Sequence, residues 1–255
     1  MKNIIEKPII NDTAWFKHWF DSSFYHKLYA NRDEKEAAAF IDELLSALQP
    51  APHAEILDLG CGSGRHSKYL ASKGYSVTGL DLAASSIREA KKTETKALRF
   101  YRHDMRVAFG ENHFDFVFNF FTSFGYFKTS REDNLVISNI ASSLKTGGTL
   151  VLDYINAAYA NKRLVAAETK ETDGVIYHIS RWSDDMHFFK KIVIDDMQNR
   201  EPFEYTEQVK KFSLSDFENL FMRHGLELQQ LHGDYSLNEY CSETSPRIIL
   251  TAKKK

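Results

Sequence analysis

Short apolar runs alternate along the chain with longer segments in which apolar residues recur every three or four positions. A short run predicts a buried strand, and the longer spacing predicts a helix with one buried face. Gly74 and Gly147 stand where helix C-caps are expected. An early helix is predicted from the apolar stripe Phe40, Ile41, Leu44, Leu45 and Leu48. The strands that follow are expected near residues 55–59, 75–80, 97–101, 114–120 and 148–154, with helices near 65–73, 84–92 and 131–144.

The pattern changes after Tyr154. Three apolar runs follow one another with polar turns between them, and we expect them to form an antiparallel insert. These runs are residues 175–182, 186–195 and 203–212. A helix from Ser215 to Gly225 then leads to two last strands, near 226–232 and 247–252. The predicted fold class is therefore α/β, with a Rossmann-like, doubly wound, mostly parallel seven-stranded sheet, helices on both faces and an antiparallel β insert after the fifth strand.

A loop with three alternate glycines follows the first predicted strand, in the stretch Glu55-Ile-Leu-Asp-Leu-Gly-Cys-Gly-Ser-Gly64. Glycine lets the backbone turn tightly and approach a ligand closely. The next segment predicts a helix that begins at Arg65, and its free N–H groups would face a bound molecule. A glycine-rich turn without a ligand is the plainer alternative. The stretch predicts a loop that binds a nucleotide-type cofactor.

Two details of this loop indicate which cofactor it binds. The dinucleotide fingerprint G-x-G-x-x-G would need its third glycine at position 65, where Arg65 stands. Asp58 lies two residues before the first glycine, and its carboxylate would repel a pyrophosphate but attract an ammonium or sulfonium group. A Walker loop is excluded, because no Gly-Lys-Ser/Thr occurs in or after the loop. The loop therefore favours a zwitterionic, cationic ligand such as S-adenosyl-L-methionine.

Three more motifs follow the glycine loop: Val77-Thr-Gly-Leu-Asp81, Leu98-Arg-Phe-Tyr-Arg-His-Asp104-Met105 and Phe114-Asp-Phe-Val-Phe-Asn-Phe-Phe-Thr-Ser-Phe-Gly-Tyr126. Together with the loop they resemble the motifs of class I S-adenosylmethionine-dependent methyltransferases. Within this family they resemble the small-molecule N-methyltransferases. The resemblance extends from about Trp15 to the C-terminus. It implies an enzyme that uses S-adenosyl-L-methionine as its methyl donor.

The resemblance also implies which residues bind this cofactor. Asp81 would accept hydrogen bonds from both ribose hydroxyls, a task that suits an acceptor-only carboxylate. Asp104 would accept from the adenine amino group, and Met105 would pack on the adenine ring. The alternative for Asp104 is a turn former or helix cap. The other expected contacts from the loop and the strand ends are Asp58, Gly60, Cys61, Gly62, Gly64, Leu82, Asn119 and Phe120.

The segment 15–29 is dense in aromatic residues and looks like a lid over the cofactor. Tyr25 and Tyr29 are expected to reach the methionine end of the cofactor, and Arg32 to pair with its carboxylate. An amphipathic helix that uses its aromatic residues for packing explains the segment equally well. The resemblance therefore leaves both roles open for these residues.

Tyr126 is the residue that we expect to touch the methyl acceptor, and it is the candidate catalytic residue. Aromatic walls attract a sulfonium and its methyl group and exclude water. A core role is an equally good explanation for the phenylalanines near Tyr126. Further substrate contacts are expected from Tyr154, Tyr177 and Arg181. Tyr177 and Arg181 belong to a cluster on one predicted strand that also contains His178 and Trp182. Tyr177 and Arg181 share one face of the strand and the other two share the opposite face, so at most half of the cluster can line a pocket.

The expected domain organisation is one core with a lid and an insert. Residues 1–50 would form an N-terminal helical lid. Residues 51–156 and 213–255 would form the S-adenosylmethionine-binding core, and residues 157–212 would form an antiparallel insert on the substrate side. A core of this size is within reach of a 255-residue chain with 43% hydrophobic residues.

Charge and composition restrict the partners. The formal net charge is −2, so no broad basic surface is expected and nucleic acid is not the favoured substrate. The two cysteines, Cys61 and Cys241, are too few for a disulfide framework, which fits a cytoplasmic protein. No long apolar run predicts a membrane span, and no ligand-spaced histidine pair predicts a metal site. We expect a monomer or homodimer.

The predicted function is methyl transfer to a nucleophilic nitrogen or oxygen of a small polar molecule. Related enzymes that act on amino sugars tend to carry His where Tyr126 stands, which argues against that particular acceptor. The DNA N-methyltransferase signature Asn/Asp-Pro-Pro-Tyr is missing, because Asn119 is followed by Phe120 and Phe121. Two alternatives share the expected fold: an NAD-dependent oxidoreductase, and a non-catalytic protein that only binds S-adenosylmethionine.

Overall fold

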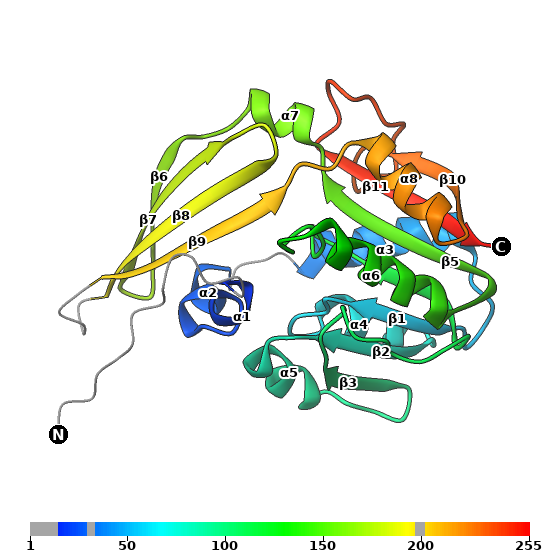
Figure 1. Ribbon diagram of the computed structural model, residues 1–255. Helices are drawn as coiled ribbons and strands as arrows, with labels where there is room; N and C mark the ends of the chain where they lie inside the picture. Colours follow the sequence, from blue (N-terminus) through cyan, green and yellow to red (C-terminus); the bar gives the residue numbers. More distant parts are fainter. Residues whose placement is uncertain (1–14, 30–33, 197–201) are drawn as a thin grey trace. The chain divides into compact units, whose positions relative to one another are not determined.

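The computed structural model describes residues 15–29, 34–196 and 202–255 (Figure 1). The chain divides into two compact units, each built from two separate stretches of sequence. The larger unit comprises residues 33–162 and 212–255, and the smaller unit comprises residues 1–32 and 163–211. The larger unit contains the glycine loop and the three motifs that follow it.

A seven-stranded sheet forms the centre of the larger unit. Its strand order is β10-β11-β5-β4-β1-β2-β3. β11 pairs antiparallel with β5 and β10, and the other neighbours pair in parallel. The predicted doubly wound, mostly parallel seven-stranded sheet is therefore confirmed. The strands are β1 Glu55–Leu59, β2 Ser76–Asp81, β3 Leu98–Arg102, β4 Phe114–Asn119, β5 Leu144–Ile155, β10 Leu226–His232 and β11 Arg247–Lys254.

Helices cover both faces of this sheet. Ile56 and Leu57 are neighbours in β1, so their side chains point to opposite faces. Ile56 lies in a buried cluster with residues of α3, α4 and α5, whereas Leu57 lies beside Ile140 of α6. α8 contacts α6 and β10. The helices of this unit are α3 Glu34–Leu48, α4 Arg65–Ser72, α5 Ala84–Lys91, α6 Ser130–Ser143, α7 Ala157–Lys162 and α8 Leu214–Arg223.

One of the two predicted helix C-caps is wrong. Gly74 has a φ angle of +95° and directly follows the C-cap residue of α4, as expected. α6, in contrast, ends at Ser143 and β5 begins at the next residue. Gly147, with a φ angle of +77°, therefore lies inside β5, near the irregularity where its pairing with β4 shifts register. A glycine in a strand marks such an irregularity as readily as a helix end.

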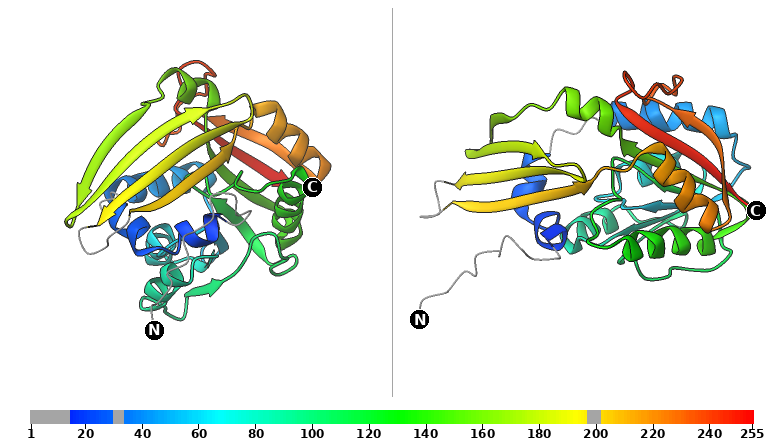
Figure 2. Two further views of the ribbon diagram at one scale, coloured as in Figure 1. Left: turned by 60° about the vertical axis from the view of Figure 1, so that its left-hand side comes forward. Right: turned by 45° about the horizontal axis from the view of Figure 1, so that its top comes forward.

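The smaller unit contains the predicted antiparallel insert as a four-stranded sheet of order β6-β7-β8-β9, which is continuous in both views of Figure 2. Three of its strands match predicted runs, but β6 was not predicted. The sequence of β6 is Ala-Glu-Thr-Lys-Glu-Thr, without the apolar alternation that identifies a half-buried strand. Charged residues suit an edge strand, because they discourage pairing with another chain. The strands are β6 Ala167–Thr172, β7 Val175–Ser183, β8 His187–Asp196 and β9 Phe203–Lys210.

Two short helices from the N-terminal segment, α1 Trp15–Trp19 and α2 Ser23–Leu28, pack on one face of this four-stranded sheet (Figure 1). Trp19 is fully buried with Tyr177 and Ile192 in the core of the smaller unit. The Tyr177 hydroxyl donates to the carbonyl of Phe24 over 3.1 Å. The aromatic residues of the N-terminal segment therefore supply packing in this unit, and their role as a lid stays a prediction.

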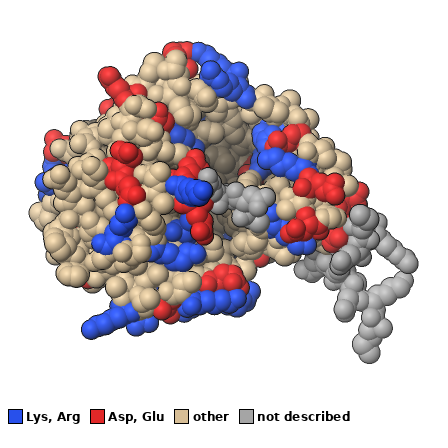
Figure 3. Space-filling model, turned by 180° about the vertical axis from the view of Figure 1, so that it is seen from behind, with Lys and Arg blue, Asp and Glu red and all other residues tan. Residues whose placement is uncertain are grey.

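Helix α3 lies in the larger unit, where it contacts α4, although it falls within the predicted lid of residues 1–50. No helix in the described part of the chain is long and apolar enough to cross a membrane. Lys and Arg side chains are interspersed with Asp and Glu on the face that Figure 3 displays. This mixed pattern agrees with the small net charge of the sequence.

Candidate functional site

The glycine loop between β1 and α4 has a backbone that only glycine adopts readily. Gly60, Gly62 and Gly64 have φ angles of +81°, +56° and +82°. A Cβ atom at Gly60 would lie 2.7 Å from the Cβ of Ser123, and one at Gly64 would lie 2.5 Å from the ring of Phe100. These two glycines are therefore needed for close packing as well as for the turn.

Gly62 differs from its neighbours because a Cβ atom there would meet nothing within 4 Å among the described residues. The amide of Gly62 donates to Oδ2 of Asp81 over 2.8 Å. The amides of Gly60 and Cys61 both donate to the carbonyl of Leu80, over 2.8 and 3.0 Å. The loop is thus fixed to the carboxyl end of β2, while Gly62 leaves room for a ligand beside the backbone.

Asp81 ends β2 and organises the loops on either side of it. Its Oδ2 accepts from the amide of Gly62, and its Oδ1 accepts from the amide of Ala83 over 2.8 Å. The side chain is half-buried, and these two hydrogen bonds fix both oxygens at the edge of the sheet where ligands of doubly wound folds bind. Leu82, the next residue, accepts from Nε of Arg102 through its carbonyl.

Asp58 is buried on the face of β1 that α4 covers. Its Oδ2 accepts from the Ser67 hydroxyl over 2.5 Å, and 1% of the residue is exposed. Burial raises the pKa of this carboxyl from 3.8 to about 6, and the nearby Asp81 adds to the effect. Cys61 is also buried, and burial raises the pKa of its thiol. The predicted contacts of both residues with the cofactor stay predictions.

Asn119 ends β4 next to the glycine loop. Its Nδ2 donates to the carbonyl of Leu59 over 2.8 Å, and the side chain is 1% exposed. Its Oδ1 is buried without a hydrogen-bond partner among the described residues. A buried acceptor without a donor costs free energy, so Oδ1 is suited to receive a donor from a ligand. The next residue, Phe120, is buried against His66 and Phe40.

Asp104 forms a forked ion pair with Arg106, which the sequence did not reveal. Nε of Arg106 donates to Oδ1 over 3.0 Å and Nη2 donates to Oδ2 over 2.7 Å. Arg106 also donates to Glu132 at the start of α6, over 2.6 Å. The carboxylate is therefore held in place by a bidentate partner, and its predicted contact with adenine stays a prediction.

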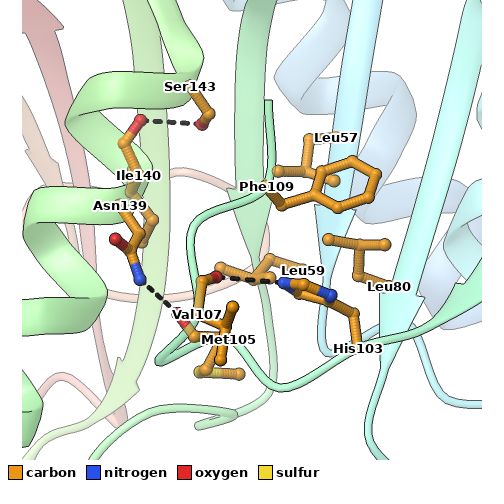
Figure 4. Close-up of a pocket in the computed structure, with 10 residues that line it drawn as sticks. All are labelled: Leu57, Leu59, Leu80, His103, Met105, Val107, Phe109, Asn139, Ile140 and Ser143. Atoms are coloured by element: carbon orange, nitrogen blue, oxygen red, sulfur yellow. Dashed lines mark hydrogen bonds between the residues drawn. The ribbon is translucent and has the colours of Figure 1, made fainter. Parts of the chain in front are cut away.

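Met105 lies beside a small pocket between β1, β2 and α6 (Figure 4). The Met105 carbonyl accepts from Nδ2 of Asn139 over 3.0 Å, and His103 contacts the carbonyl of Val107 in the same wall. The cavity volume is about 10 Å³, roughly what a single water requires. In this structure the cavity itself is too small to hold an adenine ring, and the predicted contact of Met105 with adenine stays a prediction.

Tyr126 closes a turn that begins after β4. Its hydroxyl donates to the carbonyl of Thr122. Tyr154 is fully buried and packs among Phe124, Phe212 and Phe217. Burial raises the pKa of Tyr154 well above its ordinary value, so its hydroxyl stays neutral. Tyr126 is half-buried at the strand ends, and the predicted substrate contacts of both tyrosines stay predictions.

The remaining predicted site residues belong to the smaller unit. The Tyr25 ring packs edge-on against Trp19, and Lys190 donates to the Tyr29 hydroxyl. Tyr177 lies in the core as described, and Arg181 pairs with Glu168. Arg32 lies outside the described residues. Each described side chain has a partner within its own unit, and the roles in cofactor or substrate binding stay predictions.

Three residues near the sheet edge were missed by sequence reasoning: Asp153, Tyr235 and Arg247. Nε of Arg247 donates to Oδ1 of Asp153 over 2.7 Å, and the Tyr235 hydroxyl donates to Oδ2 over 3.1 Å. Asp153 is fully buried at the end of β5. An acid near the end of a predicted apolar strand was the available signal, because a buried carboxylate requires partners.

The glycine loop, Asp81, Asp104 and Asn119 lie at the carboxyl ends of adjacent parallel strands, as the sequence indicated. Within the described residues, no three His, Cys, Asp or Glu side chains gather in a way that could hold a metal ion. The geometry defines a doubly wound protein whose glycine loop and acidic residues lie at the strand ends, where ligands of such folds bind.

Comparison with known proteins agrees with this geometry. Residues 56–148 match the family model of a methyltransferase domain. Over 220 residues, the chain is 26% identical to the dTDP-3-amino-3,4,6-trideoxy-alpha-D-glucopyranose N,N-dimethyltransferase of Streptomyces venezuelae, covering 82% of this chain and 91% of that one. A crystal structure of a S-adenosylmethionine-dependent methyltransferase from Clostridium acetobutylicum superposes with a TM-score of 0.75 at 20% identity, over 91% and 96% of the two chains.

A second solved structure, that of the amino pentose methyltransferase CalS10 from Micromonospora echinaspora with S-adenosylmethionine bound, has a TM-score of 0.67 at 21% identity, over 92% and 98% of the chains. Residues 56–148 therefore form a methyltransferase domain, and the chain has the fold of S-adenosylmethionine-dependent methyltransferases. This match favours a methyltransferase over the two alternatives that the sequence left open, an NAD-dependent oxidoreductase and a non-catalytic binding protein.

Replacing Gly62 with alanine is expected to weaken S-adenosylmethionine binding by about tenfold or more, because the added methyl group enters space kept for the ligand. Gly74→Ala is the matched control, since its φ angle is also positive and its Cβ would also meet no described atom within 4 Å. Both variants should lose about 1 kcal/mol of unfolding free energy. Calorimetric Kd values that change equally in both variants would contradict a ligand position at Gly62.

Asp58 is expected to make stability depend on pH. Its pKa is about 6 in the folded protein and 3.8 in the reference state, so its contribution is complete below 3.8 and is lost as pH rises through 6. Between pH 7.5 and pH 5 the wild type should gain about 1.4 kcal/mol relative to Asp58→Asn. Urea unfolding of both proteins at several pH values measures this difference. Parallel pH profiles would show that Asp58 does not titrate as its burial implies.

Proposed function

We propose that this methyltransferase transfers a methyl group to a nitrogen or oxygen of a small polar molecule. The observation that carries the proposal is the aromatic turn that follows β4, residues 120–126, which packs on the glycine loop through Ser123 and Gly60. The relative from Streptomyces venezuelae, whose name describes an N,N-dimethyltransferase of an amino sugar nucleotide, supports a small acceptor. Acceptor nitrogen and acceptor oxygen are both compatible with such a turn.

Three residues of the larger unit fit the donor and would hold it. Asp81, an acceptor-only carboxylate fixed at the end of β2, would accept hydrogen bonds from the ribose hydroxyls. Asn119 would receive the ammonium group at its buried Oδ1, which has no other donor among the described residues. Gly62 would let the backbone approach the ligand. A buried acceptor, a fixed carboxylate and an open glycine together match a zwitterionic nucleoside.

Bound S-adenosylmethionine supplies a methyl group on a sulfonium, which is already a good leaving group. The work left to the protein is to align the nucleophile and to exclude water. Phe120 is 3% exposed and Phe121 is half-buried, and aromatic faces attract a cation while keeping the site dry. Tyr126 would contact the acceptor from the end of the same turn.

Residues 1–50 and 157–212 are the segments that we propose to act on the acceptor side, as a lid and as a substrate-side insert. Arg181 and Tyr29 are the polar side chains of these segments that we expect to approach a ligand, and both carry partners that a ligand would displace or share. The core of residues 51–156 and 213–255 would bind most of the donor, and Tyr25, Tyr29 and Arg32 would reach its methionine end. The acceptor preference should therefore follow changes in the insert and at Tyr126, and donor affinity should follow changes in the glycine loop and at the strand ends of the core.

The test is an assay of S-adenosylhomocysteine release with acceptors that differ in one group. A nucleotide-linked amino sugar, the same sugar with a hydroxyl, simple amines, transfer RNA and a protein mixture cover the acceptor classes. Turnover with a small acceptor supports the proposal, and the amine and hydroxyl pair decides between nitrogen and oxygen. Turnover confined to RNA or protein would refute it.

Tyr126→Phe is expected to lower kcat/KM for the acceptor by about tenfold, because it removes one hydroxyl contact and the hydrogen bond to Thr122. The Kd for S-adenosylmethionine should stay within about twofold, since the ring remains. Steady-state kinetics and calorimetry measure the two quantities. An unchanged kcat/KM would remove Tyr126 from the acceptor site.

A further inference from the structure

The turn after β4 has an unusual backbone. Phe121 and Thr122 have φ angles of +56° and +59°. Two consecutive residues with side chains in the left-handed region are rare, and a β-branched residue such as Thr is particularly disfavoured there. Such a conformation persists only where its surroundings hold it, and it is found preferentially at functional sites.

Asp153 provides the main restraint on this turn. The amide of Phe121 donates to Oδ2 of Asp153 over 2.7 Å, and the amide of Thr122 donates to the main-chain carbonyl of Asp153 over 3.1 Å. Nη2 of Arg247 donates to the Thr122 hydroxyl over 2.9 Å, and Tyr126 donates to the Thr122 carbonyl. Hydrogen bonds to the backbone therefore fix both strained residues. Asp153 accepts two of these hydrogen bonds, one from the amide of Phe121 and one from the amide of Thr122.

Asp153 is itself anchored from the neighbouring chain segments. It lies opposite Ile249 of β11 and is fully buried, and Oδ1 accepts from Nε of Arg247 over 2.7 Å. Oδ2 accepts from the Tyr235 hydroxyl over 3.1 Å, and burial raises the pKa of Tyr235, so that hydroxyl keeps its proton. The charge of Arg247 is compensated by Asp153, so this pair is complete without a ligand.

The restrained turn reaches the glycine loop on its other side. The Phe121 ring stacks on His66 with 5.3 Å between centroids, and Cζ of Arg65 lies 4.9 Å from the same centroid. Ser123 lies so close to Gly60 that a Cβ atom there would be 2.7 Å away. Any change in the Phe121–Thr122 backbone therefore moves side chains that touch the glycine loop and the first residues of α4.

We propose that Asp153 is a positioning residue for the methyl donor: it holds the Phe121–Thr122 turn in its left-handed conformation, so that the turn and the glycine loop form one preorganised wall of the donor site. Without this restraint the turn populates ordinary conformations, and only a fraction of molecules is ready to bind. The inference concerns donor binding, so it stands whether or not the proposed acceptor class is correct.

The test compares Asp153→Asn with Asp115→Asn. Asp115 is a matched control, because it also accepts from a backbone amide, that of Glu55, and from a cation, Lys145, but it lies on β4 away from the turn. In Asp153→Asn an amide NH₂ replaces one acceptor oxygen, and the Kd for S-adenosylmethionine should rise about tenfold. Asp115→Asn should change it by less than about twofold. Calorimetry gives the Kd, and thermal unfolding without ligand gives the stability of each variant.

Thr122→Gly separates positioning from general damage. Glycine adopts a positive φ angle without strain, so the double variant Asp153→Asn, Thr122→Gly should recover about fivefold of the lost affinity. In the wild-type background the same glycine also loses the hydrogen bond from Arg247, so the Kd of this single variant is the reference for the double variant. If Asp153→Asn does not fold, Tyr235→Phe, which removes one hydrogen bond to Asp153, takes its place in the same cycle. Equal Kd changes in both asparagine variants, or no recovery with glycine, would overturn the proposal.

Discussion

Replacing Asp81 with alanine is expected to raise the Kd for S-adenosylmethionine by about 100-fold or more. The carboxylate would lose two hydrogen bonds to ribose hydroxyls, and hydrogen bonds to a charged group contribute about 1.5–3 kcal/mol each. The same change removes the acceptors of the Gly62 and Ala83 amides, so the glycine loop also loses its attachment to β2. Both effects weaken binding, and calorimetry measures their sum.

Asp184→Ala is the control for the general cost of removing a carboxylate that accepts from two backbone amides. Asp184 also accepts from two backbone amides, those of Met186 and His187, but it lies in a turn of the smaller unit. Its loss should change the Kd by less than about twofold. Wild-type affinity in Asp81→Ala would contradict the placement of the donor at the end of β2, even if the loop variant at Gly62 behaves as expected.

Replacing Gly64 with alanine is expected to lower the free energy of unfolding by about 3 kcal/mol, since the new methyl group adds steric overlap to an unfavourable φ angle. The Cβ atom would lie 2.5 Å from the ring of Phe100, which is fully buried and cannot withdraw. Gly225→Ala isolates the cost of the φ angle, because its Cβ would meet no described atom within 4 Å. Urea unfolding of both variants measures the difference.

Phe100→Leu should restore part of the stability of Gly64→Ala, because the smaller side chain leaves room for the methyl group. The single variant Phe100→Leu should be less stable than wild type, as it leaves a cavity in the core. A double variant whose loss equals the sum of the two single losses would show that Gly64 and Phe100 do not interact.

The strand, glycine loop and helix at residues 55–72 could be predicted because every signal in them is local. The apolar run, the spacing of the glycines and the following helix each point to the same structure. The carboxyl ends of the parallel strands then follow from the alternation of strands and helices, which brought Asp81, Asp104 and Asn119 to one edge. The fold class and this part of the site were therefore accessible from the sequence.

Other features could not be predicted because they depend on distant partners. β6 carries charged residues that resemble a loop and forms only by pairing with β7. Nothing in the local sequence marks Phe121 and Thr122 for a positive φ angle, since their restraint comes from Asp153 and Arg247, far along the chain. The substrate role of Tyr177 stays a prediction, and its ring lies in the core of the smaller unit with residues of α1 and α2. The alternation along the strand predicted which residues share a face with Tyr177. It could not show which helices cover that face.

The smaller unit joins the N-terminal segment to strands that are synthesised much later, which affects folding on the ribosome. Trp19 donates to Glu207 across 188 positions of sequence, and Tyr177 reaches the carbonyl of Phe24 across 153. During synthesis the aromatic N-terminal segment leaves the ribosome long before the strands that bury it, and domains fold as their residues become available. We expect this unit to fold only after β9 has emerged, with Trp19 exposed until then, so ribosome-bound chains that stop before residue 203 should show solvent-exposed tryptophan fluorescence.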